Sequence, residues 1–411
     1  MHDHLNFRSA SFLRVHILDT MAFYNGRCTD PSGGFYHYFK DDGTVYDRTT
    51  RHLVSSTRFI FNFSMAARRF GDAQWLASAR HGLRFLREHH RNPHTGGYAW
   101  QLKFDNGHKE VLDDTNHCYG LAFVLLAHAH AAMAGVSEAR PGIAETFDLM
   151  EQHFWQPAHR LYADEASADW KLGSYRGQNA NMHACEAMLA AYEATRDERY
   201  IERAAVLADS VTRRLAAHGK GLIWEHYRVD DRTGDWAPDW DYNRHDKSNI
   251  FRPWGYQPGH HTEWAKLLLI LDRLQSADWL LPRARQLFAA GTEHAWDSTH
   301  GGLYYGIAHD DKGGPSKFVV CDADKYFWVQ AESIAAAALL ALRTGEGGYW
   351  DWYDRLWSYS WRHFVDHLNG AWYRILSVDN RKYSDEKSPA GKTDYHTMGA
   401  CYEVMSALDA A

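Results

Sequence analysis

The sequence has 411 residues, of which 45% are hydrophobic and 24% charged, and it carries a formal net charge of -7. This balance is typical of a globular protein with a large buried core and argues against extended disorder. It also argues against a nucleic-acid partner or an anionic membrane surface, because both require clustered Lys and Arg. The expected partner is a small, roughly neutral molecule.

Cysteine usage and the start of the chain indicate a compartment. The five cysteines lie far apart and never form a C-x-x-C pair, so neither a disulfide framework nor a zinc knuckle is predicted. Residues 1–8 lack an apolar signal segment, and no apolar run approaches the roughly 18 residues that a membrane span needs. We therefore expect a cytoplasmic protein with no membrane partner.

Segments with helical periodicity follow one another along the whole chain. In residues 73–89, for example, Trp75, Ala79, Leu83 and Leu86 recur with the spacing of one helix face. The predicted helices cover residues 10–26, 54–71, 73–90, 115–134, 140–156, 178–195, 197–217, 259–275, 277–297, 324–345, 347–366 and 393–410.

A loop signature separates these helices into pairs. Small residues precede an aromatic residue and a polar turn, and the pattern returns after roughly 60 to 80 residues, which is long enough for two helices. Its copies are Gly33-Gly34-Phe35, Gly96-Gly97-Tyr98, His159-Arg160-Leu161-Tyr162, Gly221-Leu222-Ile223-Trp224, Gly301-Gly302-Leu303-Tyr304 and Asn369-Gly370-Ala371-Trp372. Loop residues 222–228 and 302–307 have the composition of short strands, which predicts a small β-hairpin in each connection.

Together these features predict an all-α fold. Six helical hairpins would form an (α/α)6 barrel with short β-hairpins in the connecting loops, built as a single catalytic domain over residues 1–411. An open solenoid of helical hairpins is the structural alternative, because stacked pairs show the same kind of period. The number of units and the absence of polar capping repeats favour closure.

Unusual polar residues gather in the first turns of the even-numbered helices, which converge in a closed barrel. They are Arg58, Asn116, His117, Tyr119, Asn179, His183, Glu186, His260, Glu263, Lys325, Trp328, Glu332, Asp394 and His396. Asn179, His183 and Glu186 are four and three residues apart, which places them on one helix face. A polar stripe aimed at the barrel axis needs partners or water, so we expect a cavity there.

Two histidines occupy matching positions. Pro258-Gly259 stops a loop and His260 opens the following helix, while Thr393-Asp394 can cap the last helix just before His396. The partial positive charge at a helix start disfavours imidazolium, which leaves a neutral imidazole ready to accept a proton. Two such histidines facing one cavity suit the enolisation of a sugar.

The same residues also have simpler interpretations. A histidine at a helix start can be a structural cap, and His183 can be a hydrogen-bonded core residue. Arg58 and Arg252 can be ordinary salt-bridge partners, and Trp328 can be plain core packing. The parallel placement of His260 and His396 favours the functional interpretation for that pair.

The sequence predicts neither a metal nor a cofactor. No H-E-x-x-H motif occurs, and no Gly-rich phosphate loop precedes a helix. Isomerisation without a metal requires cationic or hydrogen-bonding groups to stabilise an enediolate. Arg58, Arg252 and His183 are the candidates for this role.

Several motifs resemble those of the N-acylglucosamine 2-epimerase superfamily, most closely its aldose-ketose isomerase branch of mannose isomerases and sulfoquinovose-processing relatives. The likeness extends over nearly the whole chain. The motifs are Thr57-Arg58-Phe59-Ile60-Phe61, Asn116-His117-Cys118-Tyr119-Gly120, Asn179-Ala180-Asn181-Met182-His183, Arg252-Pro253, Pro258-Gly259-His260, Glu263-Trp264, Lys325-Tyr326-Phe327-Trp328 and Lys392-Thr393-Asp394-Tyr395-His396.

The resemblance implies interconversion of D-mannose and D-fructose through a cis-enediol, with a monosaccharide as the substrate. His396 would take the proton from C2 and return it to C1. His260, oriented by Glu263, would assist ring opening and proton transfer around O5 and O1. The resemblance further implies a set of side chains that bind hydroxyls or stabilise the enediolate. They are Arg58, Tyr119, Asn179, His183, Arg252 and Trp328.

Other functions stay open from the sequence. The same residues serve sugar 2-epimerases, which return the proton to the opposite face of C2. An inverting glycosidase would use two carboxylates roughly 6.5–9.5 Å apart, with Glu225, Asp239 and Glu263 as candidates. A non-catalytic sugar-binding protein is a third function class, and assembly into a homo-oligomer is also open.

Overall fold

The protein is mostly helical, as the periodicity predicts. The computed structural model describes residues 5–246, 249, 251–310 and 317–410. Its α-helices are α1 (Ala10–Tyr24), α2 (Leu53–Phe70), α3 (Ala73–Phe85), α4 (Cys118–Met133), α5 (Arg140–His153), α6 (Gln178–Thr195), α7 (Glu198–Asp209), α8 (Pro258–Leu274), α9 (Leu280–Glu293), α10 (Phe327–Thr344), α11 (Gly347–His363) and α12 (Tyr395–Ala410). Each lies where the sequence predicts a helix. The last turn of the predicted third helix is the π-helical turn Leu86–His90, and that of the predicted seventh helix is the π-helical turn Ser210–Arg214 followed by the 3-10 helix Leu215–Gly219.

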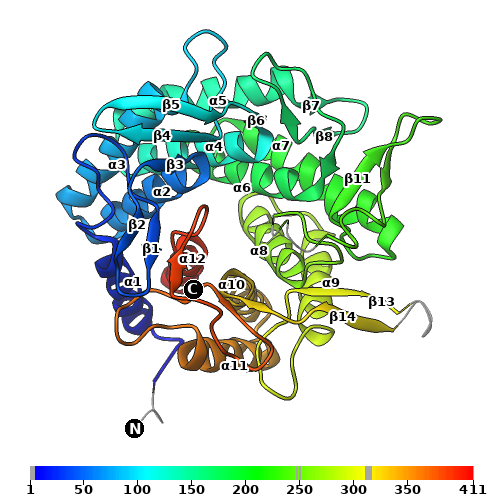
Figure 1. Cartoon of the computed structure of the whole chain (residues 1–411). Helices are drawn as coiled ribbons and strands as arrows, with labels where there is room; N and C mark the ends of the chain where they lie inside the picture. Colours follow the sequence, from blue (N-terminus) through cyan, green and yellow to red (C-terminus); the bar gives the residue numbers. More distant parts are fainter. Residues whose placement is uncertain (1–4, 247–248, 250, 311–316, 411) are drawn as a thin grey trace.

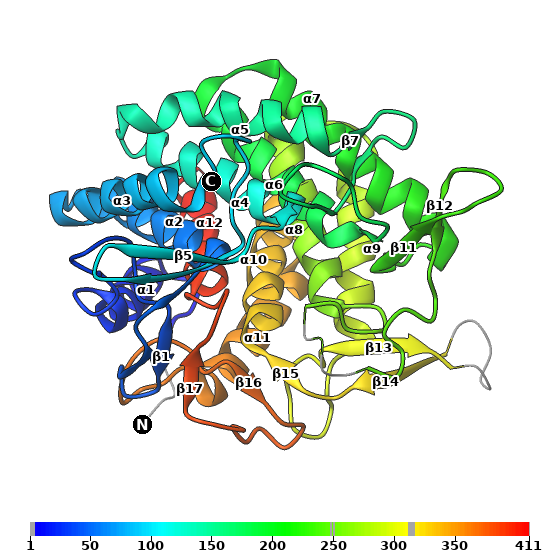
Figure 2. The ribbon, with the colours of Figure 1, turned by 45° about the horizontal axis from the view of Figure 1, so that its top comes forward.

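The even-numbered helices contact one another in succession. Helix α2 packs on α4, α4 on α6, α6 on α8, α8 on α10 and α10 on α12, and α12 returns to contact α2 (Figure 1). Each odd-numbered helix packs outside an even one, as α9 does on α8 and α11 on α10. Figure 2, in which the view is tilted, shows the same helices from the side.

Burial explains which helices lie inside. Every residue of α8 from Pro258 to Asp272 is buried, because the helix has neighbours on all sides. Helix α3 buries only one face, with Trp75, Ala79, Gly82 and Leu83 directed toward the core. The contrast between a fully buried and an amphipathic helix separates inner from outer helices throughout the described chain.

The strands form small antiparallel sheets in the connections. The sheets join β17 (Glu386–Ser388), β1 (Tyr38–Lys40) and β2 (Val45–Asp47); β3 (Thr50–His52), β4 (Gln101–Asp105) and β5 (His108–Asp113); β6 (Asn116–His117) and β9 (Glu165–Ala166); β7 (Trp155–Gln156) and β8 (Leu161–Tyr162); β10 (Arg176–Gly177), β11 (His226–Val229) and β12 (Trp236–Pro238); β13 (Gly306–His309) and β14 (Phe318–Asp322); and β15 (Lys325–Tyr326) and β16 (Ile375–Leu376).

Small hairpins occur within the connections, as predicted, in β1–β2, β4–β5, β7–β8, β11–β12 and β13–β14, but further pairings join different connections. The backbone just before each even helix pairs with the next connection along the chain: β3 with β4, β6 with β9, β10 with β11 and β15 with β16. A bridge from Tyr256 to Ile307 does the same before α8, and β17 pairs with β1 before α12. These pairings tie successive connections together and fix the starts of the even helices.

The loop signature has a steric basis. Gly302 has φ +82°, a conformation that glycine adopts without strain, and a Cβ at this position would collide with the ring of Tyr359. In the weakest copy Arg160 takes the equivalent left-handed conformation at φ +52°.

Among the described residues, no helix has both the length and the apolar composition that crossing a bilayer requires.

Candidate active site

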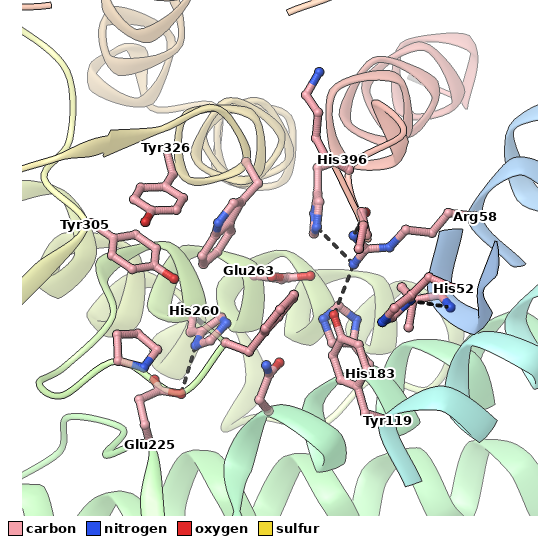
Figure 3. Close-up of a pocket in the computed structure, with 18 of the residues that line it drawn as sticks. His52, Arg58, Tyr119, His183, Glu225, His260, Glu263, Tyr305, Tyr326 and His396 are labelled. Carbon is pink, nitrogen blue, oxygen red and sulfur yellow. Dashed lines mark hydrogen bonds and ion pairs between the residues drawn. The ribbon is translucent and has the colours of Figure 1, made fainter. Parts of the chain in front are cut away.

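A cavity of about 130 Å³ lies where the first turns of the even-numbered helices meet (Figure 3). Eight of the nine side chains predicted for the site line it. They are Arg58, Tyr119, Asn179, His183, His260, Glu263, Trp328 and His396. The lining also contains side chains that the sequence-based site did not include. Among them are His52, Glu225, Tyr305, Tyr326 and Lys392.

Arg252 is the predicted site residue that does not line this cavity. Its guanidinium donates to Glu165 at 2.6 Å and to Tyr242 at 3.4 Å, and it lies 3.8 Å from the ring centre of Tyr175. Tyr175 lines the cavity, so Arg252 lies behind one wall. This position indicates that Arg252 holds Tyr175 in the cavity wall and does not contact a ligand directly.

His396 is held in one tautomer. Its Nδ1 lies 2.6 Å from Oε1 of Glu332, and its Nε2 lies 3.3 Å from Nη2 of Arg58. A guanidinium can only donate, so Nε2 accepts and Nδ1 carries the proton that it donates to Glu332. Burial and the nearby Arg58 lower the pKa of His396 well below its ordinary value. The ring is therefore neutral and has a lone pair at Nε2.

His260 has a carboxylate partner, but not the predicted one. Its Nδ1 lies 2.9 Å from Oε2 of Glu225, and this oxygen also accepts from Nε2 of Gln178 at 2.8 Å. The expectation that Glu263 orients His260 is wrong, because the hydrogen bond goes to a residue on the connection before α8. In the neutral imidazole, donation from Nδ1 to Glu225 leaves Nε2 as the unprotonated nitrogen.

Glu263 lies between His260 and His396 in Figure 3 and is 1% exposed. Neither of its oxygens has a hydrogen-bond partner within the part of the chain that the structure describes. Burial, together with the negative charge of Glu332, raises the pKa of Glu263 well above its ordinary value. Glu263 is thus a neutral carboxylic acid that faces the cavity and can donate a hydrogen bond.

His183 and the aromatic side chains shape the remaining surface. The Nδ1 of His183 lies 3.0 Å from Oε2 of Glu186, and its ring packs edge-on to Tyr119 with 5.0 Å between centroids. The ring of Trp328 lies 5.0 Å from that of His260 and 5.8 Å from that of His396. Trp328 therefore offers an apolar face beside both imidazoles, which suits a sugar ring.

The start of α12 is fixed differently from the prediction. Asp394 has φ +52°, and its carboxylate accepts from Tyr24 at 2.6 Å, from Lys392 at 2.6 Å and from the backbone of Trp372 at 3.3 Å. The carboxylate also accepts from Oγ1 of Thr397 in the first turn of α12 at 3.0 Å, so Asp394 binds the helix start through a side chain as well as binding neighbouring elements. The result is still a fixed first turn, which determines where His396 points.

A group of buried carboxyls lies behind the histidines. Oxygens of Glu186 and Glu263 approach Nδ1 or Nε2 of His183, and those of Glu263 and Glu332 approach His396, each set within 4.8 Å. The ammonium of Lys266 lies in this group, 2.5 Å from Glu332 and 3.9 Å from Glu186. These carboxyls therefore surround a cation that the protein itself supplies.

Sequence reasoning missed the roles of two important contributors, Lys266 and Glu225. Lys266 could have been found, because it is a charged residue inside the apolar run from Trp264 to Leu271 and lies three residues after Glu263. Glu225 has no such signal as the partner of His260, because 35 residues and no common helix separate the two.

Comparisons with known proteins agree with the motifs. The sequence profile of the N-acylglucosamine 2-epimerase (GlcNAc 2-epimerase) family matches residues 34–400. A D-mannose isomerase of Marinomonas mediterranea is 54% identical over 404 residues, which cover 98% of each chain. A D-mannose isomerase of Thermobifida fusca is 37% identical over 309 residues, which cover 73% of this chain and 71% of the relative. A crystal structure of a D-mannose isomerase superposes with a TM-score of 0.92 at 52% identity, covering 98% of this chain and all of that one. The chain belongs to the N-acylglucosamine 2-epimerase family.

Proposed function

We propose that the protein is an aldose-ketose isomerase that interconverts D-mannose and D-fructose through a cis-enediol. The observation that carries the proposal is the pair His260 and His396, each with Nδ1 bound to a carboxylate and Nε2 left to accept a proton at one cavity. The 54% identity to a D-mannose isomerase supports the choice of substrate.

His396 is the base in this proposal. Its Nε2 takes the proton from C2 of the open-chain aldose, and the electron pair of the broken C–H bond forms the C1–C2 double bond of the enediolate. The same nitrogen then gives the proton to C1, while the proton of the O2 hydroxyl passes to O1, so that C2 becomes the carbonyl carbon of the ketose. Arg58 lies 3.3 Å from this nitrogen, so its positive charge is placed to stabilise the oxyanion that forms beside it.

His260 transfers protons between the sugar oxygens, and Glu263 donates a hydrogen bond to one of them. The Nε2 of His260 takes the proton of the anomeric hydroxyl as the C1–O5 bond breaks and gives that proton to O5, which leaves the carbonyl at C1 and a neutral imidazole. Glu263, as a neutral acid, donates a hydrogen bond to the sugar oxygen that gains negative charge. Five further predicted side chains contact the substrate hydroxyls or the face of the sugar. They are Arg58, Tyr119, Asn179, His183 and Trp328.

We also propose that the inner helices form a closed (α/α)6 barrel and that residues 1–411 make one catalytic domain. The return contact from α12 to α2 and the pairing of successive connections support closure. The family profile extends over residues 34–400, which supports a single unit. Localisation in the cytoplasm, assembly into a homo-oligomer and independence from metals and cofactors stay predictions.

A substrate panel tests the proposal. Purified protein is incubated separately with D-mannose, D-glucose and cellobiose, and the products are identified by chromatography. We expect D-fructose from D-mannose as the fastest conversion. The main alternative is a sugar 2-epimerase, which the same histidines would serve. Conversion of cellobiose to its 2-epimer at a higher kcat/KM than that of D-mannose would overturn the proposal.

A further inference from the structure

A buried lysine connects the two sides of the proposed site. Lys266 lies on α8 and is only 6% exposed. Its ammonium binds Oε2 of Glu332 at 2.5 Å and lies 3.9 Å from Oε1 of Glu186. A charged group in such a position is costly unless its partners neutralise it, so the arrangement is expected to have a function beyond filling space.

Each of these carboxylates holds a histidine with its other oxygen. Oε1 of Glu332 lies 2.6 Å from Nδ1 of His396, and Oε2 of Glu186 lies 3.0 Å from Nδ1 of His183. The interactions thus form one continuous chain from His396 through Glu332, Lys266 and Glu186 to His183. A single ammonium stands at the midpoint between two histidines that line the cavity.

We propose that Lys266 is a positioning residue, which keeps both carboxylates ionised and in place so that they hold His396 and His183 as neutral, Nδ1-protonated rings. This inference rests on the proposed function, because it assigns Lys266 to the proton transfer in which His396 is the base. Lys266 does not line the cavity and acts only through the two carboxylates.

The balance of charge supports this assignment. Three buried carboxyls, Glu186, Glu263 and Glu332, face one ammonium. Burial alone would raise the pKa of Glu186, but Lys266 and the hydrogen bond from His183 hold that pKa below its ordinary value. Burial raises the pKa of Glu332, and Lys266 opposes the rise. Without the ammonium, the carboxylates would draw a proton onto themselves or onto the histidines.

The groups that surround His396 come from every inner helix packed against it. The charged and titratable ones are Arg58 on α2, Tyr119 on α4, His183 and Glu186 on α6, Glu263 and Lys266 on α8, Glu332 on α10 and Tyr395 on α12 itself. Of these, Arg58 and Lys266 are the permanent cations. Arg58 contacts Nε2, on the side of the proposed reaction, whereas Lys266 acts on the Nδ1 side through Glu332.

The network also separates two cavities. A second cavity of about 260 Å³ lies on the other side of the chain of interactions and is lined by Glu186, Lys266, Glu332 and Tyr395, among others. His183, Glu263 and His396 line the proposed active site. The ionic chain thus lies between the two cavities and forms the floor of the proposed site.

The test compares Lys266→Met with Lys387→Met. Lys387 is a matched control, because its ammonium is also buried and binds Asp366 at 2.6 Å, and none of its contacts among the described residues is to a histidine. Lys266→Arg, which keeps the charge, is the rescue variant. Lys266→Gln, which can still hydrogen-bond to Glu332, takes the place of the methionine variant if that variant does not fold. The measurements are thermal stability, kcat, KM and the pH dependence of kcat/KM with D-mannose.

We expect both methionine variants to lose stability, but only Lys266→Met to lose kcat, on the order of 100-fold. This is less than the roughly 10⁴-fold effect of removing the carboxylate that directly orients a catalytic histidine. KM should stay within about threefold of the original value. The acid limb of kcat/KM should move to higher pH, because the uncompensated carboxylates favour imidazolium at His396. Lys266→Arg should return the acid side of the kcat/KM profile to its original pH.

A measurement without substrate separates this inference from the proposed function. The ¹⁵N resonances of His396, assigned by their loss in His396→Ala, should report a ring protonated at Nδ1 in the original protein and a different protonation state in Lys266→Met. If the original protein does not isomerise D-mannose, the proposed function fails and the resonances alone decide the role of Lys266. The inference would be overturned if Lys266→Met or Lys266→Gln left three quantities unchanged: kcat, the acid-side apparent pKa of kcat/KM, and the imidazole resonances of His396.

Discussion

The substitution Glu225→Gln would test whether His260 depends on a carboxylate. Glu225 is 4% exposed, and its Oε2 lies 2.9 Å from Nδ1 of His260. Glutamine has the same shape, but its amide can donate to Nδ1 where the carboxylate only accepts. The imidazole would then carry its proton at Nε2, where the proposed mechanism needs a lone pair.

The structure sets the scale of the expected loss. The equivalent change in a serine-protease triad, from an orienting carboxylate to an amide, lowers kcat by about 10⁴-fold through the wrong tautomer. His260 has a second neighbour in Gln178, whose amide lies 3.1 Å from Nδ1, so the fold of the site should survive the change. We expect kcat to fall by about 10³- to 10⁴-fold, or about 4–5.5 kcal/mol in activation free energy, with little change in KM.

The assay is initial-rate conversion of D-mannose to D-fructose, with thermal unfolding measured in parallel. Glu151→Gln is the control, because Glu151 is likewise a carboxylate that accepts side-chain hydrogen bonds, from Tyr162 and Arg203, and neither of these partners lines the cavity. The control should keep kcat within about threefold. If Glu225→Gln has a kcat within tenfold of the original protein, the assignment of the tautomer of His260 is refuted.

Three further predictions concern the base, the metal and pH. His396→Ala should lower exchange of the C2 proton by about 10²- to 10⁴-fold while the protein stays folded, and near-normal exchange would exclude His396 as the base. Exhaustive chelation should leave activity unchanged, because Lys266 already neutralises the buried carboxyls; a loss restored by Mn²⁺ or Zn²⁺ would contradict this. Burial lowers the pKa of His16, His90, His128 and His261 to about 4. Their contribution to stability is therefore present above about pH 6.5 and is lost as the pH falls toward 4, by about 2 kcal/mol each at pH 5. Denaturant unfolding at pH 7 and pH 5 measures this loss, and equal stabilities would contradict it.

The helices were predictable because their signal is local. A 3.6-residue period needs only a few turns of sequence, and the glycine-rich loops mark where each pair ends. Strand pairing lacked such a signal. β3 pairs with β4 across about 50 residues, and nothing within either short segment shows which other connection it pairs with. The short hairpins within connections were predicted, but the pairings between successive connections were not, for this reason.

The candidate site was predictable to the extent that it depends on helix starts. His260 and His396 both follow a loop and begin a helix, and convergence of the even helices brings them to one cavity. Their partners were harder to predict. Glu225 reaches His260 from a connection, and Glu332 reaches His396 from another helix, so neither contact follows from spacing along the chain.

Arg252 shows that position in the sequence does not determine which side chains face the cavity. It is adjacent to Pro253, which lines the cavity, yet its own side chain is directed to Glu165 and the ring of Tyr175. Two neighbouring residues can face opposite sides of a wall, and the sequence does not show which one faces the ligand.

The most direct test of the proposed mechanism is an NMR experiment with D-mannose in D₂O, in which the first product and the deuterium at C1 and C2 are followed together. The mechanism predicts D-fructose as the first product, with deuterium at C1 to the extent that the base exchanges its proton with solvent before delivering it. D-glucose that appears before any D-fructose, with deuterium at C2, would contradict it and identify a 2-epimerase.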